Sequence, residues 1–104
     1  MLYEEYDGKL KQVAALVDET KYDQALAILK SLIDSDISDI DKSMMSVNVA
    51  VVYDKKGLRE HALEWYDRGI SFEAIYFRCF VAENKASYLF QLKRYKECLA
   101  IYEE

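Results

Sequence analysis

Histidine and cysteine are the side chains that most often serve as nucleophiles, general bases or metal ligands, and this 104-residue chain holds few of them. His61 is the one histidine, and the two cysteines are Cys79 and Cys98. A zinc site needs several such ligands at short spacing, and a Cys–His nucleophile pair needs a third group that orients the base. The sequence contains no such arrangement, so we expect no catalytic activity, no metal and no cofactor.

A run of acidic residues between two apolar segments is the other candidate for chemistry. It loosely resembles a calcium loop, but it lacks the central Gly and the closing Glu of an EF-hand; its members are Asp34, Asp36, Asp39 and Asp41. We therefore expect a solvated loop in which Ser38 or Asp39 caps the following helix.

The charge balance excludes two classes of partner. The net charge is −5 and the pI is about 4.9, with Lys and Arg scattered along the chain. Nucleic acids and anionic membrane surfaces bind basic faces, so neither is expected as a partner. No apolar stretch reaches the length of a membrane span, and the first residues do not read as a signal peptide. Two cysteines do not indicate a disulfide scaffold, which favours a reducing, cytoplasmic location.

Helices must position whatever surface the protein uses. The chain has 52% hydrophobic residues, no Pro and three Gly, too few turn residues for a β-rich fold. Apolar residues recur three and four positions apart, as at Leu10, Val13 and Val17, which is typical of one face of a helix. The polar residues 18–21 separate this run from a second apolar run, so the first unit is predicted to be a helical hairpin.

An internal repeat organises the whole chain. The segments 24–29, 61–66 and 97–102 each read polar, small, Leu, variable and two large apolar residues. Their small residues, Ala25, Ala62 and Cys98, lie 37 and 36 residues apart. A recurrence of this length is the signature of a helical repeat array. We predict a single domain over residues 1–104, with repeats at about 6–39, 43–76 and 79–104, the last one incomplete.

The repeat resembles the tetratricopeptide repeat, most closely in the second unit. There, Ala50 and Ala62 hold the small positions, Tyr53 and Tyr66 the aromatic ones, and Gly57 the turn. The resemblance covers nearly the whole chain, although the family's closing Pro is absent and the spacing is two or three residues longer. It implies an all-α fold of about six helices, stacked as a right-handed superhelix with a truncated last helix.

The resemblance also implies a binding surface, because the first helix of each repeat lines a concave face in that family. By register, we predict that a peptide or partner protein contacts Lys11, Met44, Val47, Asn48, Val51, Lys55, Phe80, Asn84, Ser87 and Gln91. The equivalent Asn48 and Asn84 could read a peptide backbone with their amides, or could be exposed polar residues only. Of the positions that clamp a chaperone carboxylate in some members, only Asn48 matches, so an apolar or amphipathic segment is the expected ligand.

Two other roles remain open at this point. The domain could self-associate as a homodimer through an uncapped C-terminal end near Tyr95, Leu99 and Tyr102, or it could be a regulatory or scaffold fragment of a larger protein. Tyr102 is expected at a packing position like its equivalent Tyr66. The sequence does not decide whether Trp65 is packed between units or exposed.

Overall fold

The computed structural model describes residues 2–103, and within them it contains six α-helices and no strand. Met1 and Glu104, which the predicted domain range includes, lie outside the described residues. The helices are α1 (Tyr3–Asp18), α2 (Tyr22–Ile33), α3 (Asp39–Lys55), α4 (Arg59–Ala74), α5 (Phe80–Gln91) and α6 (Tyr95–Glu103). The all-α class predicted from the sequence is confirmed.

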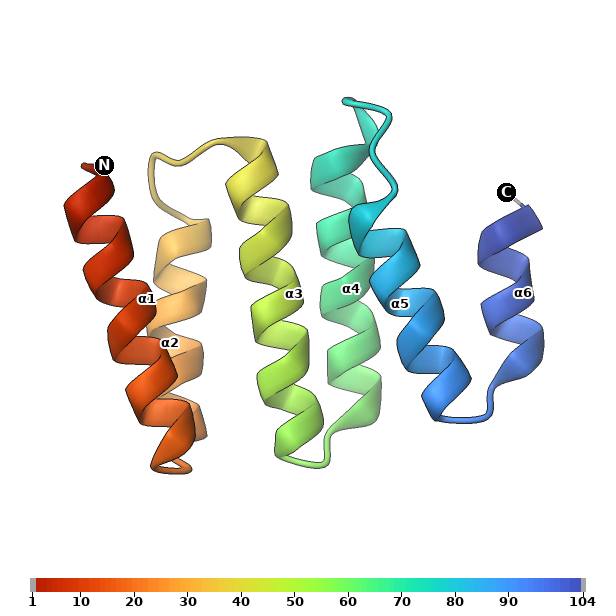
Figure 1. Ribbon diagram of the computed structural model, residues 1–104, viewed down its shortest axis with the longest axis horizontal. Coiled ribbons are helices and arrows are strands. Elements are labelled where there is room, and N and C mark those ends of the chain that lie inside the picture. Colours follow the sequence, from red (N-terminus) through yellow and green to blue (C-terminus); the bar gives the residue numbers. More distant parts are fainter. Residues whose placement is uncertain (1, 104) are drawn as a thin grey trace.

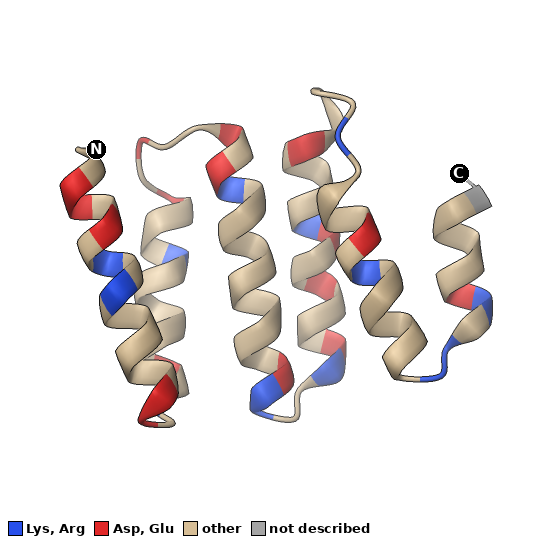
Figure 2. Ribbon diagram, in the orientation of Figure 1, with Lys and Arg blue, Asp and Glu red and all other residues tan. Residues whose placement is uncertain are grey.

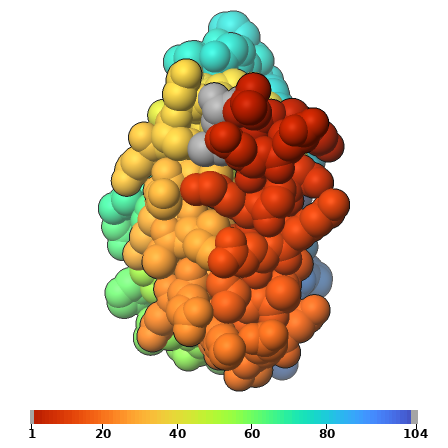
Figure 3. All heavy atoms as spheres, turned by 90° about the vertical axis from the view of Figure 1, so that its left-hand side faces the viewer, coloured from red at the N-terminus to blue at the C-terminus, as the bar shows by residue number. Residues whose placement is uncertain are grey.

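The helices form three consecutive antiparallel hairpins. Short turns join α1 to α2, α3 to α4 and α5 to α6 at one end of the molecule, and longer loops join the hairpins at the other end (Figure 1). In this view α1, α3 and α5 lie in a nearer layer, and α2 and α4 lie behind them. The shortest extent is 15 Å, which is the thickness expected of two packed helix layers. Figure 3 shows α1 and α2 side by side at the N-terminal end of the array.

The three hairpin turns have the same backbone conformation. Their central residues, Thr20, Gly57 and Lys93, have φ values of 60°, 81° and 61°. In each turn the amide that follows bonds back across five residues: Lys21 N–H to Leu16, Leu58 N–H to Tyr53 and Arg94 N–H to Leu89, at 2.8, 2.9 and 2.9 Å. This is the Schellman arrangement, which satisfies carbonyls that a helix end leaves free. Gly57, which the sequence assigned to a turn, is therefore at a left-handed turn position, and the same geometry recurs 37 residues earlier and 36 residues later.

The small residues of the repeat lie in the core, where they allow helices to approach closely. Ala25, Ala50, Ala62 and Ala86 are completely buried, and Cys98 is 9% exposed. Gly69 on α4 has the same role, because a Cβ there would lie 2.9 Å from a methyl group of Val81. Residues with larger side chains at these positions would push neighbouring hairpins apart.

The loops between hairpins are fixed by side-chain caps. Ser38 is the N-cap of α3, and its hydroxyl accepts a hydrogen bond from the amide of Asp41, 3.1 Å away, as predicted. At the next loop, the buried carboxylate of Glu73 accepts hydrogen bonds from the amides of Val81 and Ala82 at distances of 2.9–3.2 Å. These two amides belong to the first turn of α5, so Glu73 satisfies donors that the helix itself cannot.

One packing expectation is wrong. Tyr102 is 66% exposed, whereas its equivalent Tyr66 is 5% exposed. The ring of Tyr66 lies against Tyr88 of the next hairpin, at a centroid distance of 5.5 Å. Among the described residues no helix lies against the corresponding side of α6, so Tyr102 has nothing to pack on.

Candidate functional site

A groove runs between α1 and α3 on the side of the nearer layer. Its floor consists of apolar core residues, including Val13, Leu29 and Val52, and its volume is about 460 Å³. The remaining lining residues are Leu10, Ala14, Val17, Asp18, Asn48, Val51 and Lys55. Because most of these side chains are apolar, the groove suits a hydrophobic side chain of a ligand.

A second, smaller groove of about 240 Å³ lies between α3 and α5. It is more polar than the first and is lined by Val51, Asp54, Tyr66, Asn84, Ser87, Tyr88 and Gln91. Val51 lines both grooves, so the two lie side by side with this residue of α3 between them. We refer to the two grooves together as the front face. Figure 2 shows that α3 carries charged residues only near its two ends, which leaves the centre of the front face uncharged.

Six of the ten predicted binding residues line the front face; these are Asn48, Val51, Lys55, Asn84, Ser87 and Gln91. The other four line neither groove. Lys11 is exposed and pairs with Asp7 at 3.0 Å, and Val47 packs against the core. Met44 and Phe80 are about two-fifths exposed and lie in the N-terminal parts of α3 and α5. Register placed them on α1, α3 and α5 but did not account for the limited length of the grooves.

The two equivalent asparagines differ in their hydrogen bonding. The amide nitrogen of Asn84 donates to the carbonyl of Phe80, 2.8 Å away and one turn earlier in the same helix. The amide nitrogen of Asn48 makes only a long contact of 3.9 Å with the sulfur of Met45. Asn48 therefore keeps its donor available for a ligand, while Asn84 offers chiefly its amide oxygen.

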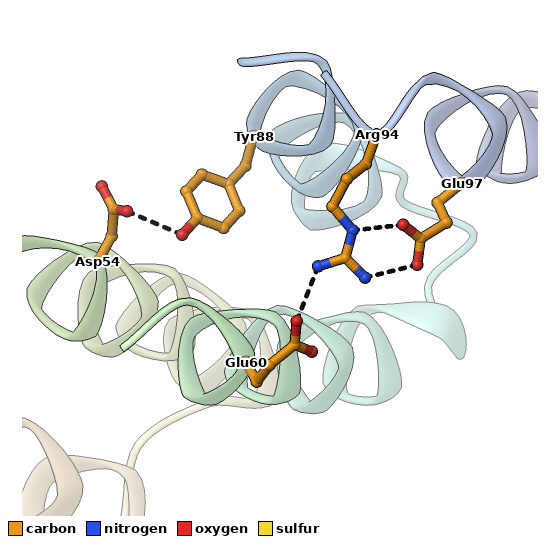
Figure 4. A network of polar contacts seen from close by, with 5 residues as sticks. All are labelled: Asp54, Glu60, Tyr88, Arg94 and Glu97. Carbon is orange, nitrogen blue, oxygen red and sulfur yellow. Dashed lines mark hydrogen bonds and ion pairs between the residues drawn. The ribbon is translucent and has the colours of Figure 1, made fainter. Parts of the chain in front are cut away.

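Sequence reasoning missed a polar contact between two residues that line the α3–α5 groove. The hydroxyl of Tyr88 on α5 donates to Oδ1 of Asp54 on α3 at 2.8 Å (Figure 4). Burial and this hydrogen bond raise the pKa of Tyr88 well above its ordinary value. Burial, and the nearby Asp54 charge, also raise the pKa of Tyr66. The 34-residue separation of Asp54 and Tyr88, close to one repeat, was the signal available in the sequence.

A second cluster in Figure 4 joins the last two hairpins near their turns. Arg94 donates through Nη1 to Glu60 at 2.9 Å and through Nη2 to Glu97 at 2.7 Å. Its guanidinium holds the pKa of Glu97 below the usual range. Lys56 and Asp23 form the related contact between the first two hairpins. Asp23, Glu60 and Glu97 are spaced by 37 residues, so this ion-pair position recurs with the repeat.

The histidine and the two cysteines lie on different parts of the fold: His61 on α4, Cys79 just before α5 and Cys98 on α6. His61 is exposed and its ring lies against that of Tyr53 at a tilt of 34°, with centroids 5.2 Å apart. Cys79 is exposed, and Cys98 is buried in the last hairpin. Within residues 2–103, no group of three His, Cys, Asp or Glu side chains is arranged to hold a metal ion. Trp65, which the sequence left open, is 8% exposed.

The fold and site thus define an all-helical protein with a two-part groove on one face. Neither family models, curated proteins nor solved structures yield a match to this chain. None of the helices within residues 2–103 combines the length and apolar character that crossing a bilayer requires.

Proposed function

We propose that the chain is a tetratricopeptide-type repeat protein whose front face binds a segment of a partner protein. The family assignment is supported by three hairpins that each have a left-handed residue at the same place in the turn and buried small residues at the same positions. It implies that the hairpins stack as a right-handed superhelix. The observation that carries the binding proposal is the pair of adjacent grooves that α1, α3 and α5 line, with Val51 between them.

The two grooves favour different chemistry in the ligand. The apolar floor between α1 and α3 accommodates one or two aliphatic or aromatic side chains. The groove between α3 and α5 presents the exposed carboxylate of Asp54, the oxygen of Asn84 and the amide of Gln91, which suit hydrogen-bond donors. An amphipathic segment satisfies both conditions, with its apolar side toward α1 and its polar side toward α5.

A peptide-display selection on the wild-type chain tests this function. Selected peptides should lose at least about tenfold in affinity for Val51→Glu, because the new charge would lie unpaired between the two grooves. Ala27→Glu is the matched control, since Ala27 is exposed on α2 and receives the same charge. Peptides that bind both variants alike, or a selection that yields no binder, would refute the proposal.

A second candidate function is self-association through the last hairpin. Phe90, Tyr95, Leu99 and Tyr102 are between 48% and 66% exposed, and the rings of Phe90 and Tyr95 meet edge to face at 5.4 Å. Exposed apolar surface of this kind commonly marks an interface. Light scattering over a concentration series should show a dimer that Leu99→Glu makes monomeric; a wild-type monomer at all concentrations would exclude it.

We also propose a reducing, cytoplasmic location, which the two unpaired thiols of Cys79 and Cys98 support. Fractionation of cells that express the chain from its own gene tests this, and recovery outside the cytoplasmic fraction would contradict it.

A further inference from the structure

Another groove lies on the opposite side from the front face, between α2 and α4. Its volume is about 580 Å³, and Tyr53 of α3 forms part of its floor. We call it the back groove; its lining residues are Lys30, Ile33, Asp34, Tyr53, His61, Glu64, Trp65, Arg68, Ser71 and Phe72. Its lining includes the cations Lys30 and Arg68 and the imidazole of His61, together with two acidic residues, Asp34 and Glu64.

Lys30 is the central cation of the back groove. Its ammonium group donates to the hydroxyl of Tyr53 at 2.6 Å and lies 5.1 and 5.4 Å from the ring centroids of Tyr53 and Trp65. Lys30 is partly buried, and no carboxylate within the described residues lies within ion-pair distance of it. One of its three N–H donors is used, so two remain for a ligand.

Two further basic side chains flank this ammonium group. The guanidinium of Arg68 lies 4.3 Å from the centroid of Trp65 and binds Glu64 through Nη2 at 3.1 Å. The ring of His61 lies against that of Tyr53 at a tilt of 34°. The rings of Tyr53 and Trp65 take the place of water on one side of the Lys30 ammonium group, and their attraction for the charge is weaker than that of an anion. An anion would therefore bind more strongly here than at a fully exposed lysine.

The two acidic residues of the back groove leave Lys30 available. Glu64 is engaged by Arg68 through a pair that is exposed on both sides. Asp34, the C-cap residue of α2, follows Lys30 by four positions, but it is exposed and does not pair with it. Lys30 therefore makes its hydrogen bond to a neutral phenol instead of to a neighbouring carboxylate.

We propose that the back groove binds an oxyanion, a carboxylate or a phosphate, with Lys30 as the main ligand and Arg68 and His61 beside it. The site is independent of the front face, since α2 and α4 line it and none of its residues lines either front groove. A purely structural role for Lys30, fastening α2 to α3 and α4, predicts no anion binding at all.

Trp65 provides the readout, because it is the one tryptophan of the chain and lies in the groove. Inorganic phosphate and, separately, acetate are titrated into the wild-type chain at fixed pH, with NaCl holding the ionic strength constant. We expect a saturable change in tryptophan fluorescence with a midpoint on the order of millimolar for so small a ligand. Saturation with phosphate alone assigns a phosphate site, and saturation with both assigns an oxyanion site of either kind.

Variants separate binding from structure. Lys30→Met should weaken the apparent affinity at least about fivefold, whereas Lys96→Met, which removes an exposed charge from α6, should not. If Lys30→Met does not fold, Arg68→Gln takes its place and should also weaken binding. The absence of a saturable change in the wild type, or equal affinity in the Lys30 and Lys96 variants, would overturn the proposal. Val51→Glu should bind phosphate normally, so failure here is distinguishable from failure of the front face.

Discussion

The hydroxyl of Tyr88 and the carboxylate of Asp54 form a hydrogen bond of 2.8 Å that joins the second hairpin to the third. Tyr88 is 6% exposed, and Asp54 lies at the surface. The contact thus connects the wall of the α3–α5 groove to the packing between hairpins. A ligand that donates a hydrogen bond to Asp54 would lie next to the phenol of Tyr88, which is held in place by this contact.

Removing this hydroxyl should lower stability moderately. Tyr88→Phe keeps the buried ring and loses one hydrogen bond to a carboxylate that water can reach, so we expect the free energy of unfolding to fall by about 1 kcal/mol. Urea unfolding of Tyr88→Phe, Asp54→Ala and the double variant measures the coupling between the two residues. Strictly additive effects of the two substitutions would show that the contact contributes nothing.

The raised pKa of Tyr88 predicts a loss of stability at high pH. In the unfolded chain the phenol titrates near its ordinary value of 10.0, while in the folded chain burial and Asp54 keep it protonated to higher pH. Stability is therefore complete below pH 10 and falls as the pH rises above it, because only the unfolded state releases the proton. Thermal unfolding midpoints between pH 8 and 11 should drop less steeply in Tyr88→Phe, where Tyr66 still contributes. Identical slopes would contradict the prediction.

The shared turn conformation predicts stabilising substitutions. Thr20 and Lys93 have φ values near 60°, a region that disfavours a residue with a Cβ, especially a β-branched one. Thr20→Gly and Lys93→Gly should each raise the free energy of unfolding by about 0.5–1 kcal/mol, and Gly57→Ala should lower it by a similar amount. Ala15→Gly, in the exposed interior of α1, is the control and should be destabilising. A loss of stability in both turn variants would show that their backbones are not strained.

Glu73 is predicted to be the most sensitive polar residue of the fold. It is 1% exposed and satisfies the first amides of α5. Glu73→Ala leaves these donors buried without an acceptor, which should cost about 2–3 kcal/mol, while Glu73→Gln keeps one acceptor oxygen and should cost less. Hydrogen exchange should locate the loss of protection at Val81 and Ala82. Equal stability of the two variants would argue against the capping role.

Some elements of the structure could be predicted from the sequence and others could not. Periodicity and the recurrence of Ala25, Ala62 and Cys98 predicted the helices and their buried small positions, because packing at close approach requires small residues at fixed intervals. Gly57 was recognisable as a turn residue from its type alone. Thr20 and Lys93 were not, since neither residue type indicates a left-handed backbone and only the alignment with Gly57 reveals it.

The side-chain contacts were harder to foresee than the helices. Lys30 and Trp65 are 35 residues apart, and their proximity depends on how α2 and α4 lie across α3. Whether a residue on α1, α3 or α5 lines a groove depends on where that groove ends, which the sequence did not show for Lys11, Met44, Val47 and Phe80. The exposure of Tyr102 follows from what lies beside α6, which a repeat pattern within one hairpin does not encode.

The central claim is that a peptide binds on the front face. Its most direct test is to map the backbone amide chemical shifts when a peptide selected against the wild-type chain is added. If the peptide binds the front face, the largest changes lie on α1, α3 and α5, around Asn48, Val51 and Asn84, with little change on the outer sides of α2 and α4. Changes confined to α6, or to the back groove around Lys30, would contradict it.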